Sequence, residues 1–332
     1  MTDRLIKQIN IADSDLSISS IGLGCVTFGR EIDQDRSFKI LDYAFEKSIN
    51  FFDTAESYGG GNIQLYRKAK YGTEDVREVS KEMNSSEKIL GRWIANNRCR
   101  KNVVICTKIS SEPTPENIKK ALDQSLQNLR TDYVDIYLFH NLSRTVPLSE
   151  SLQVLNELVK DGYIKVIGAS NFDVDDLKQA HNVTQKNSFE RFKVIQSPYS
   201  LADRRAEAKL FPYCQSHNIT ITSYSPLGAG FLTGKYSPDK ANFPKGTRFH
   251  ISPGHADIYF NDKNFRIVDK LKEKSGNLNI PMVQLAMSWA MTDRAVSSVL
   301  VGAREISHIE NALTSAAMDL DPQLREEMSH WP

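Results

Sequence analysis

The sequence lacks an excess of charge of either sign. Its 332 residues include 42 lysines and arginines against 41 aspartates and glutamates, a formal net charge of +1. Phosphate backbones and anionic membrane surfaces attract proteins that carry a clear positive excess. The charge balance therefore disfavours a role on nucleic acid or on a membrane surface.

Long apolar runs are also missing. No stretch approaches the roughly 18 apolar residues that a membrane-spanning helix needs, and no basic segment followed by an apolar one opens the chain. We therefore expect a cytoplasmic protein without a membrane partner. Cysteine is scarce, and Cys25, Cys99, Cys106 and Cys214 show no CxxC spacing. This pattern predicts reduced, buried side chains and neither disulfides nor metal ligands.

Glycine and proline are modest in number, at 17 and 12 residues, whereas 40% of the chain is hydrophobic. This composition excludes a collagen-like or disordered chain and indicates a globular protein with a large core. A prior of about 150 residues per domain suggests two domains, but α/β barrels reach this length as a single domain. The pattern of elements has to decide between them.

Short runs rich in β-forming residues recur along the chain. Most are apolar throughout, which is typical of parallel strands covered on both faces. We predict eight such strands, at residues 18–23, 49–54, 103–108, 134–140, 164–170, 194–199, 220–224 and 297–301. Segments with helical apolar spacing lie between them, at residues 35–47, 115–129, 149–160, from 173 towards 180, and 283–291.

This alternation predicts a (β/α)8 TIM barrel that includes residues 1–332 in one domain, with an N-terminal β-hairpin. A doubly wound sheet is the alternative, but it usually has fewer strands and a glycine-rich first turn. Two long connections, at residues 58–90 and 227–261, interrupt the alternation. Both follow the carboxyl end of a strand, where barrel enzymes keep their sites, so we expect functional loops at that face.

The sequence does not match several common motifs of functional sites. GLGCVTFG has Thr27 where a dinucleotide fingerprint needs glycine, and GAGFLTGKY has Ala229 and Tyr236 where a phosphate-binding loop needs glycine and Ser/Thr. The chain has no GxSxG elbow and no HxxxH or HxH spacing, so we predict neither a serine hydrolase nor a metal site.

Three neighbouring predicted strands each end in an ionisable residue: Asp53, Lys108 and His140. Tyr58 lies just beyond the first of them. Parallel strands lie about 4.8 Å apart, so we expect these groups to meet at one end of the barrel. Taken singly, Asp53 could cap a turn, Lys108 could snorkel from the rim and His140 could be a core histidine. Their conjunction favours a functional site.

The chemistry of this set is specific. An ammonium stabilises a phenolate, so we expect Lys108 to lower the pKa of Tyr58. Asp53 would keep Lys108 charged, and a neutral His140 could orient a carbonyl oxygen towards Tyr58. The set can deliver a proton to an oxygen that acquires negative charge. Because it includes no nucleophile or metal, hydride delivery to a carbonyl is the simplest partner reaction.

The sequence resembles the aldo-keto reductases, NAD(P)H-dependent barrel enzymes that reduce aldehydes and ketones, over about residues 18–316. The motifs that carry the resemblance are FFDTAESYG, VICTK, YLFHN, VIGASNF, VIQSPYS, SYSPLGAGFLTGKY and VGAREISHIEN. By this resemblance Asp53, Tyr58, Lys108 and His140 match the catalytic tetrad, with Tyr58 as proton donor.

The same resemblance implies three groups of coenzyme contacts. The nicotinamide would be held by Ser170, Asn171, Gln196 and Tyr224. The pyrophosphate would be wrapped by residues 225–235, including Ser225, Leu227, Gly230 and Lys235, with Arg248 as a further contact. The adenosine end would meet Gly302, Arg304, His308 and Asn311. Arg304 and His308 near a helix N-terminus favour a 2′-phosphate, hence NADP(H) over NAD(H).

The resemblance implies a small-molecule carbonyl substrate, but neither its identity nor the oligomeric state follows from the sequence. His308 stands where relatives usually have Gln, and Glu310 and Asn311 come one position earlier than their usual acidic residue and Asn. Two other functions stay open: alcohol or sugar oxidation by the same groups, and a coenzyme-binding regulatory subunit similar to potassium-channel β subunits. Those subunits often lack the strand-end histidine, so His140 favours an enzyme.

Overall fold

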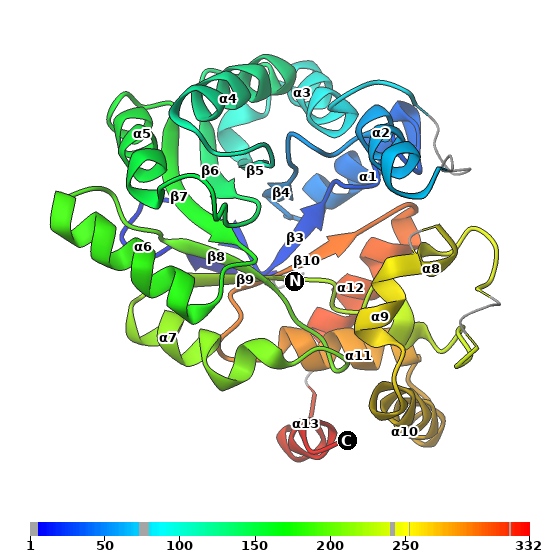
Figure 1. Cartoon of the computed structure of the whole chain (residues 1–332). Helices are drawn as coiled ribbons and strands as arrows, with labels where there is room; N and C mark the ends of the chain where they lie inside the picture. The colour runs from blue at the N-terminus through cyan, green and yellow to red at the C-terminus, as the bar shows by residue number, and fades with distance from the viewer. Residues whose placement is uncertain (1–5, 73–79, 240–242, 252, 319) are drawn as a thin grey trace.

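A computed structural model describes residues 6–72, 80–239, 243–251, 253–318 and 320–332. Its central feature is a closed parallel barrel (Figure 1). The strands are β3 (Ile21–Gly24), β4 (Phe51–Asp53), β5 (Val104–Ile109), β6 (Val134–Phe139), β7 (Ile164–Ser170), β8 (Val194–Pro198), β9 (Thr220–Tyr224) and β10 (Ser298–Gly302). They follow one another around the barrel in chain order, and β10 closes it by pairing with β3. The predicted TIM barrel is confirmed.

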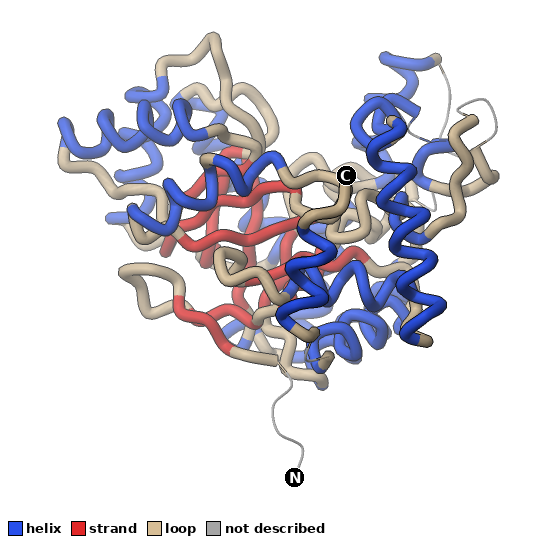
Figure 2. Tube along the Cα trace, turned by 90° about the horizontal axis from the view of Figure 1, so that it is seen from below, coloured by secondary structure: helices blue, strands red, loops and turns tan. Residues whose placement is uncertain are grey.

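Helices surround the strands, as Figure 2 also shows from another side. Those that follow successive barrel strands are α1 (Gln34–Glu46), α3 (Ser85–Asn97), α4 (Pro115–Leu129), α5 (Leu148–Lys160), α6 (Val174–Asn187), α7 (Leu210–Ser216), α11 (Met282–Met291) and α12 (Ile306–Ala317). The additional helices are α2 (Gly60–Tyr71), α8 (Arg248–Ile251), α9 (Ala256–Tyr259), α10 (Asp262–Leu278) and α13 (Pro322–Ser329). Within the described ranges, no helix is both long and apolar enough to cross a bilayer.

Helix α4 illustrates how local sequence sets these elements. Thr114 caps it by accepting a hydrogen bond from the backbone N–H of Asn117 at 3.2 Å, and Pro115 occupies the first turn, where no N–H is needed. Ile118, Leu122 and Leu129 are buried on one face. Capping and apolar period agree here, so the predicted bounds match the observed helix.

Seven of the eight predicted strands lie within two residues of their observed bounds, but the run at residues 18–23 is not one strand. It divides into β2 (Ser17–Ser19) and β3 on either side of Ser20. β2 pairs antiparallel with β1 (Gln8–Asn10), and Ser20 N donates to Lys7 O at 2.8 Å. This pairing confirms the N-terminal hairpin.

The hairpin contributes to the barrel core. Ile11, Leu16 and Ile18 are buried in one cluster with interior barrel residues that include Phe51 and Leu138. A second, larger cluster fills the space between strands and helices. Burying apolar side chains on both faces of each strand explains the continuous apolar runs in the sequence.

The two long connections follow the carboxyl ends of β4 and β9, as predicted, but they are not loops throughout. The first contains α2, and the second contains α8 and α9. Aromatic rings pack the second connection into a small core, in which Phe260 lies 5.0 Å from Phe249 and 5.3 Å from Phe231 between ring centroids. Residues 73–79, 240–242 and 252 of these predicted connections lie outside the described residues.

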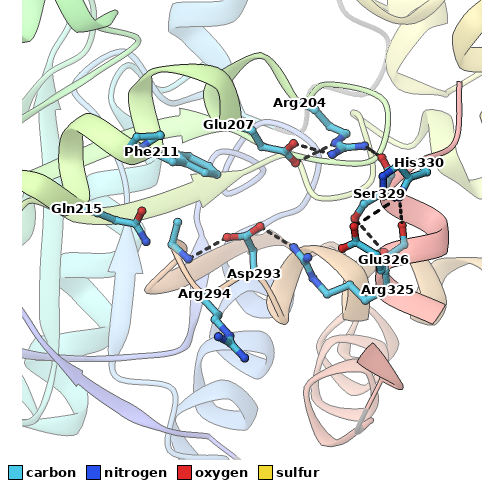
Figure 3. Close-up of a pocket in the computed structure, with 12 residues that line it drawn as sticks. Arg204, Glu207, Phe211, Gln215, Asp293, Arg294, Arg325, Glu326, Ser329 and His330 are labelled. Carbon is cyan, nitrogen blue, oxygen red and sulfur yellow. Dashed lines mark hydrogen bonds and ion pairs between the residues drawn. The ribbon is translucent and has the colours of Figure 1, made fainter. Parts of the chain in front are cut away.

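A cavity of about 390 Å³ lies between α7, the end of α11 and α13 (Figure 3). Charged residues of its lining form ion pairs, Arg204 with Glu207 at 2.6 Å and Arg325 with Asp293 at 2.5 Å. Arg204 also donates to the backbone oxygen of Ser329 in α13. These contacts attach α13 to the outside of the barrel, and none of the predicted site residues lines the cavity.

Candidate active site

The register of the barrel places the three strand-end groups on successive steps. Asp53 is level with Cys106 on β5, so Lys108 lies two residues farther along its strand. Lys108 is level with Leu138 on β6, and His140 lies two residues beyond that level. The steps reflect the stagger that closes a barrel. The long side chain of Lys108 bridges the first step.

Lys108 is fully buried and points into the barrel. Its Nζ donates to Asp53 Oδ1 and to the backbone oxygen of Thr54, both at 2.7 Å. The other carboxylate oxygen of Asp53 accepts from Gln196 Nε2 at 2.8 Å. Burial alone would lower the pKa of Lys108, but attraction to Asp53, helped by Tyr58, raises it above its ordinary value. The ammonium therefore stays charged in the core.

Tyr58 lies over this ion pair. Lys108 Nζ is 4.9 Å from the centroid of its ring, and the ring of His140 meets it edge-on with centroids 5.5 Å apart. Burial raises the pKa of Tyr58, and Lys108 lowers it by a smaller amount, so the pKa stays above its ordinary value. Lys108 therefore acts on this pKa in the predicted direction, but desolvation of the phenolate, which the sequence did not reveal, outweighs the nearby cation.

His140 is neutral. Burial, together with the charge of Lys108, lowers its pKa to about 3. Its Nδ1 lies 2.6 Å from Ser110 Oγ, and its backbone oxygen accepts from Asn171 Nδ2 at 2.9 Å. Sequence reasoning missed Ser110, although its position two residues after Lys108 at the end of the same strand could have pointed to it.

The residues predicted around the nicotinamide gather at the ends of β7, β8 and β9. Tyr224 OH donates to Asn171 Oδ1 at 2.7 Å, and Asn171 Nδ2 donates to Ser170 Oγ at 3.2 Å. Ser170 is level with Gln196, whose amide also reaches Asp53. Two hydrogen bonds thus connect this group with Asp53 and His140: Gln196 donates to Asp53, and Asn171 donates to the backbone oxygen of His140.

The segment at residues 225–235 has an unusual backbone. Ser225, Gly228, Ala229 and Gly230 all have positive φ, between +55° and +89°. At Gly230 a Cβ would lie 3.3 Å from Lys235 Nζ, so a side chain there would crowd the ammonium. Leu227 carbonyl accepts from Gly230 N at 3.0 Å. A tight turn of this kind brings backbone and a cation close to whatever binds above it.

Lys235, the last residue of this segment, lies near a second cation, Arg304. Burial lowers the pKa of Lys235, and Arg304 adds to the effect, as expected for like charges held near each other. Arg304 is 3.6 Å from Glu31, a buried carboxylate on the loop after β3 that sequence reasoning missed. Two neighbouring cations beside a glycine-rich turn fit the phosphates of a dinucleotide. Amide groups beside a tyrosine fit its carboxamide.

The remaining predicted coenzyme contacts are more dispersed. Gly302 ends β10 and is exposed, and His308 lies in the first turn of α12. Asn311 Oδ1 accepts from Gln284 Nε2 of α11 at 2.9 Å, so this side chain joins two helices. Arg248 begins α8 in the second connection.

A profile of the aldo/keto reductase family matches residues 20–329. The chain belongs to the aldo/keto reductase family. It is therefore an NAD(P)H-dependent oxidoreductase, and the family implies a small-molecule carbonyl substrate.

Individual relatives differ in the roles that their names describe. An Escherichia coli protein named NADH-specific methylglyoxal reductase is 28% identical over 98% of both chains. A Schizosaccharomyces pombe aldo-keto reductase, yakc, whose name includes NADP(+), is 28% identical over 89% of this chain and 82% of its own. A probable voltage-gated potassium channel subunit beta of Oryza sativa is also 28% identical, over 96% and 93%. Family membership therefore leaves substrate and coenzyme preference open.

Proposed function

We propose that this enzyme reduces an aldehyde or ketone with NADPH and that Tyr58 donates the proton to the carbonyl oxygen. A bound reduced nicotinamide supplies the hydride. The observation that carries the proposal is the position of Tyr58, whose ring centroid lies 4.9 Å from Lys108 Nζ and 5.5 Å from the centroid of the His140 ring. An acid, a cation that stabilises its conjugate base and a neutral donor meet in one place.

Each residue has a separate task in this proposal. Lys108 stabilises the phenolate that forms when Tyr58 gives up its proton. Asp53 holds the Lys108 ammonium in place through a hydrogen bond of 2.7 Å. His140, neutral because of its low pKa, orients the carbonyl oxygen by donating a hydrogen bond. Proton donation by a positioned side chain is worth about 100-fold or more in rate.

The coenzyme contacts complete the proposal. Ser170, Asn171, Gln196 and Tyr224 would hold the nicotinamide end; Ser225, Leu227, Gly230, Lys235 and Arg248 the pyrophosphate; and Gly302, Arg304, His308 and Asn311 the adenosine end. Arg304 adds positive charge at the proposed adenosine end, which supports NADPH over NADH because a 2′-phosphate adds negative charge there. The substrate class extends to sugars and hydroxylated ketones, since polar residues fill the first long connection.

The substitution Tyr58→Phe tests the function directly. It removes the proton donor and keeps the ring, so turnover should fall about 100-fold or more while NADPH still binds. The assay follows the loss of NADPH absorbance over a panel of aldehydes, ketones, sugars and hydroxylated ketones. Fluorescence titration measures the Kd of NADPH.

Tyr43→Phe is the matched control, because the Tyr43 hydroxyl lies on α1 and contacts Glu310 at 3.4 Å. It should leave turnover unchanged. Undiminished turnover in Tyr58→Phe would refute the proposed role of Tyr58. Tighter binding of NADH than of NADPH by the wild-type protein would overturn the coenzyme preference alone.

A further inference from the structure

A short chain of hydroxyl groups ends on the ring of His140. Ser110 Oγ lies 2.6 Å from His140 Nδ1, and Ser57 Oγ lies 2.8 Å from Ser110 Oγ. Ser57 directly precedes Tyr58 on the connection after β4, whereas Ser110 follows the end of β5. The chain therefore joins the ends of three neighbouring strands.

The backbone around this chain is anchored at several points. His140 N donates to the carbonyl of Ile109 at 2.9 Å, and Ser111 N donates to Glu56 Oε1 at 2.5 Å. Glu56 N in turn donates to the carbonyl of Lys108 at 3.2 Å. These hydrogen bonds connect the segments that carry Ser57, Ser110 and His140. They therefore help to hold the two hydroxyls near the imidazole.

A neutral imidazole has one protonated and one unprotonated ring nitrogen. The protonation state of Nδ1 therefore decides whether Nε2 donates or accepts a hydrogen bond. If Ser110 donates to Nδ1, the proton sits on Nε2, which can donate to a carbonyl oxygen. If Nδ1 donates to Ser110, Nε2 has only a lone pair and cannot. Nε2 of His140 makes no hydrogen bond to the residues that the structure describes.

A hydrogen bond donated by Ser57 would favour the first arrangement. Ser110 has a single hydroxyl proton, and it can accept as well as donate. When Ser57 donates to Ser110 Oγ, the proton of Ser110 is directed to Nδ1. Both hydroxyls then donate in the same direction along the chain, towards the histidine.

We propose that Ser110, supported by Ser57, is a positioning residue that holds His140 in the tautomer with its proton on Nε2. This inference rests on the proposed function, in which His140 donates to the carbonyl oxygen. It adds two residues whose effect on catalysis passes through the imidazole and not through contact with the substrate.

Nitrogen NMR of the full chain, labelled with ¹⁵N-histidine and saturated with NADP+, tests the tautomer without turnover. His140→Gln assigns the signal. We expect the Nε2–H tautomer in the wild type and a clear increase of the Nδ1–H tautomer in Ser110→Ala, with a smaller increase in Ser57→Ala. Ser143→Ala is the matched control, because its hydroxyl bonds Glu112 on the surface, and it should leave the signal unchanged.

Kinetics provide the second readout. Losing one hydrogen bond that orients a catalytic group should lower kcat about 10-fold in Ser110→Ala, with the Kd of NADPH unchanged. Ser110→Thr, which keeps a hydroxyl, should recover most of the lost activity. A wild-type signal of the Nδ1–H tautomer, or a tautomer and kcat that do not change in Ser110→Ala, overturns the inference.

The two proposals fail in distinguishable ways. If Tyr58→Phe keeps full turnover, the proposed function fails whatever the state of His140. If Tyr58→Phe loses turnover but Ser110→Ala changes neither signal nor rate, only the role of Ser110 fails.

Discussion

At Tyr58, burial and charge act in opposite directions on one hydroxyl. Burial raises its pKa, and the Lys108 ammonium lowers it by less. The net result keeps Tyr58 protonated throughout the neutral range, in which a proton donor has to carry its proton. His140, with a pKa lowered to about 3, stays neutral over the same range.

These shifts predict the pH dependence of carbonyl reduction. The acidic form of Tyr58 is the active one, and its raised pKa moves the loss of that form to higher pH. We therefore expect kcat/KM for the carbonyl substrate to be flat between about pH 5 and 9 and to fall only near or above the ordinary tyrosine value of about 10. The measurement is a pH profile of kcat/KM at saturating NADPH. A fall centred between about pH 6 and 8 would show that another group controls the proton.

Candidate site residues could be predicted from strand ends, but their hydrogen-bond partners could not. Gln196 was expected to hold coenzyme, yet its amide also holds Asp53 at 2.8 Å. The position of Ser110 just after Lys108 places it near the strand ends, but only its 2.6 Å distance to His140 Nδ1 identifies its partner. A pairwise contact between residues far apart in the sequence leaves no local pattern.

At the scale of elements, α3 and α4 pack closely because Gly91 has no side chain. A Cβ at Gly91 would lie 2.2 Å from the backbone oxygen of Asn128 and 2.7 Å from backbone atoms of Leu129. Backbone atoms cannot move aside as a flexible side chain would. The approach of these two helices therefore depends on a glycine at this position.

Gly91→Ala should lower the free energy of unfolding by about 1–3 kcal/mol, because the added methyl group overpacks a helix contact. Gly276→Ala in α10 is the matched control, since a Cβ at that position would have no described atom within 4 Å. That change should raise stability by up to about 1 kcal/mol, as alanine favours a helix over glycine. Urea denaturation measures the free energy of unfolding of both variants. Equal effects of the two substitutions would contradict the proposed role of Gly91 in the helix contact.

Element types were predictable where capping and apolar period agree, as in α4. They were not where packing decides. Residues 60–71 begin with two glycines and have the composition of a polar loop, yet they form α2. The second connection has no regular period because its aromatic residues pack against one another and not along one face. In the second connection, tertiary contacts overrode local preference.

For the whole molecule, α13 is attached to the outer layer of the barrel. Met328 is fully buried, and Ser329 Oγ accepts from Trp289 Nε1 at 3.0 Å. Glu327 pairs with Lys274 of α10 at 2.7 Å. The paired charges around the cavity of Figure 3 add to these contacts. The helix therefore joins α10 and α11 from outside.

Met328→Ala should lower the free energy of unfolding by about 2–5 kcal/mol, because it leaves a void in a buried contact. Gln323→Ala, at an exposed position on the same helix, should change it by less than about 0.5 kcal/mol. Thermal unfolding followed by circular dichroism measures the difference. Turnover at low temperature should stay near the wild-type value in both variants, since α13 contributes none of the proposed site residues.

The sequence by itself determined the barrel, the location of the long connections and the candidate residues at the strand ends, because apolar period and strand polarity are local properties of the chain. Only the tertiary structure decided that residues 18–23 divide between hairpin and barrel, that burial outweighs Lys108 at Tyr58, and that Ser57 and Ser110 lead to His140. Desolvation and hydrogen bonding depend on residues that closure of the barrel brings together. The sequence of any single segment does not show which residues these will be.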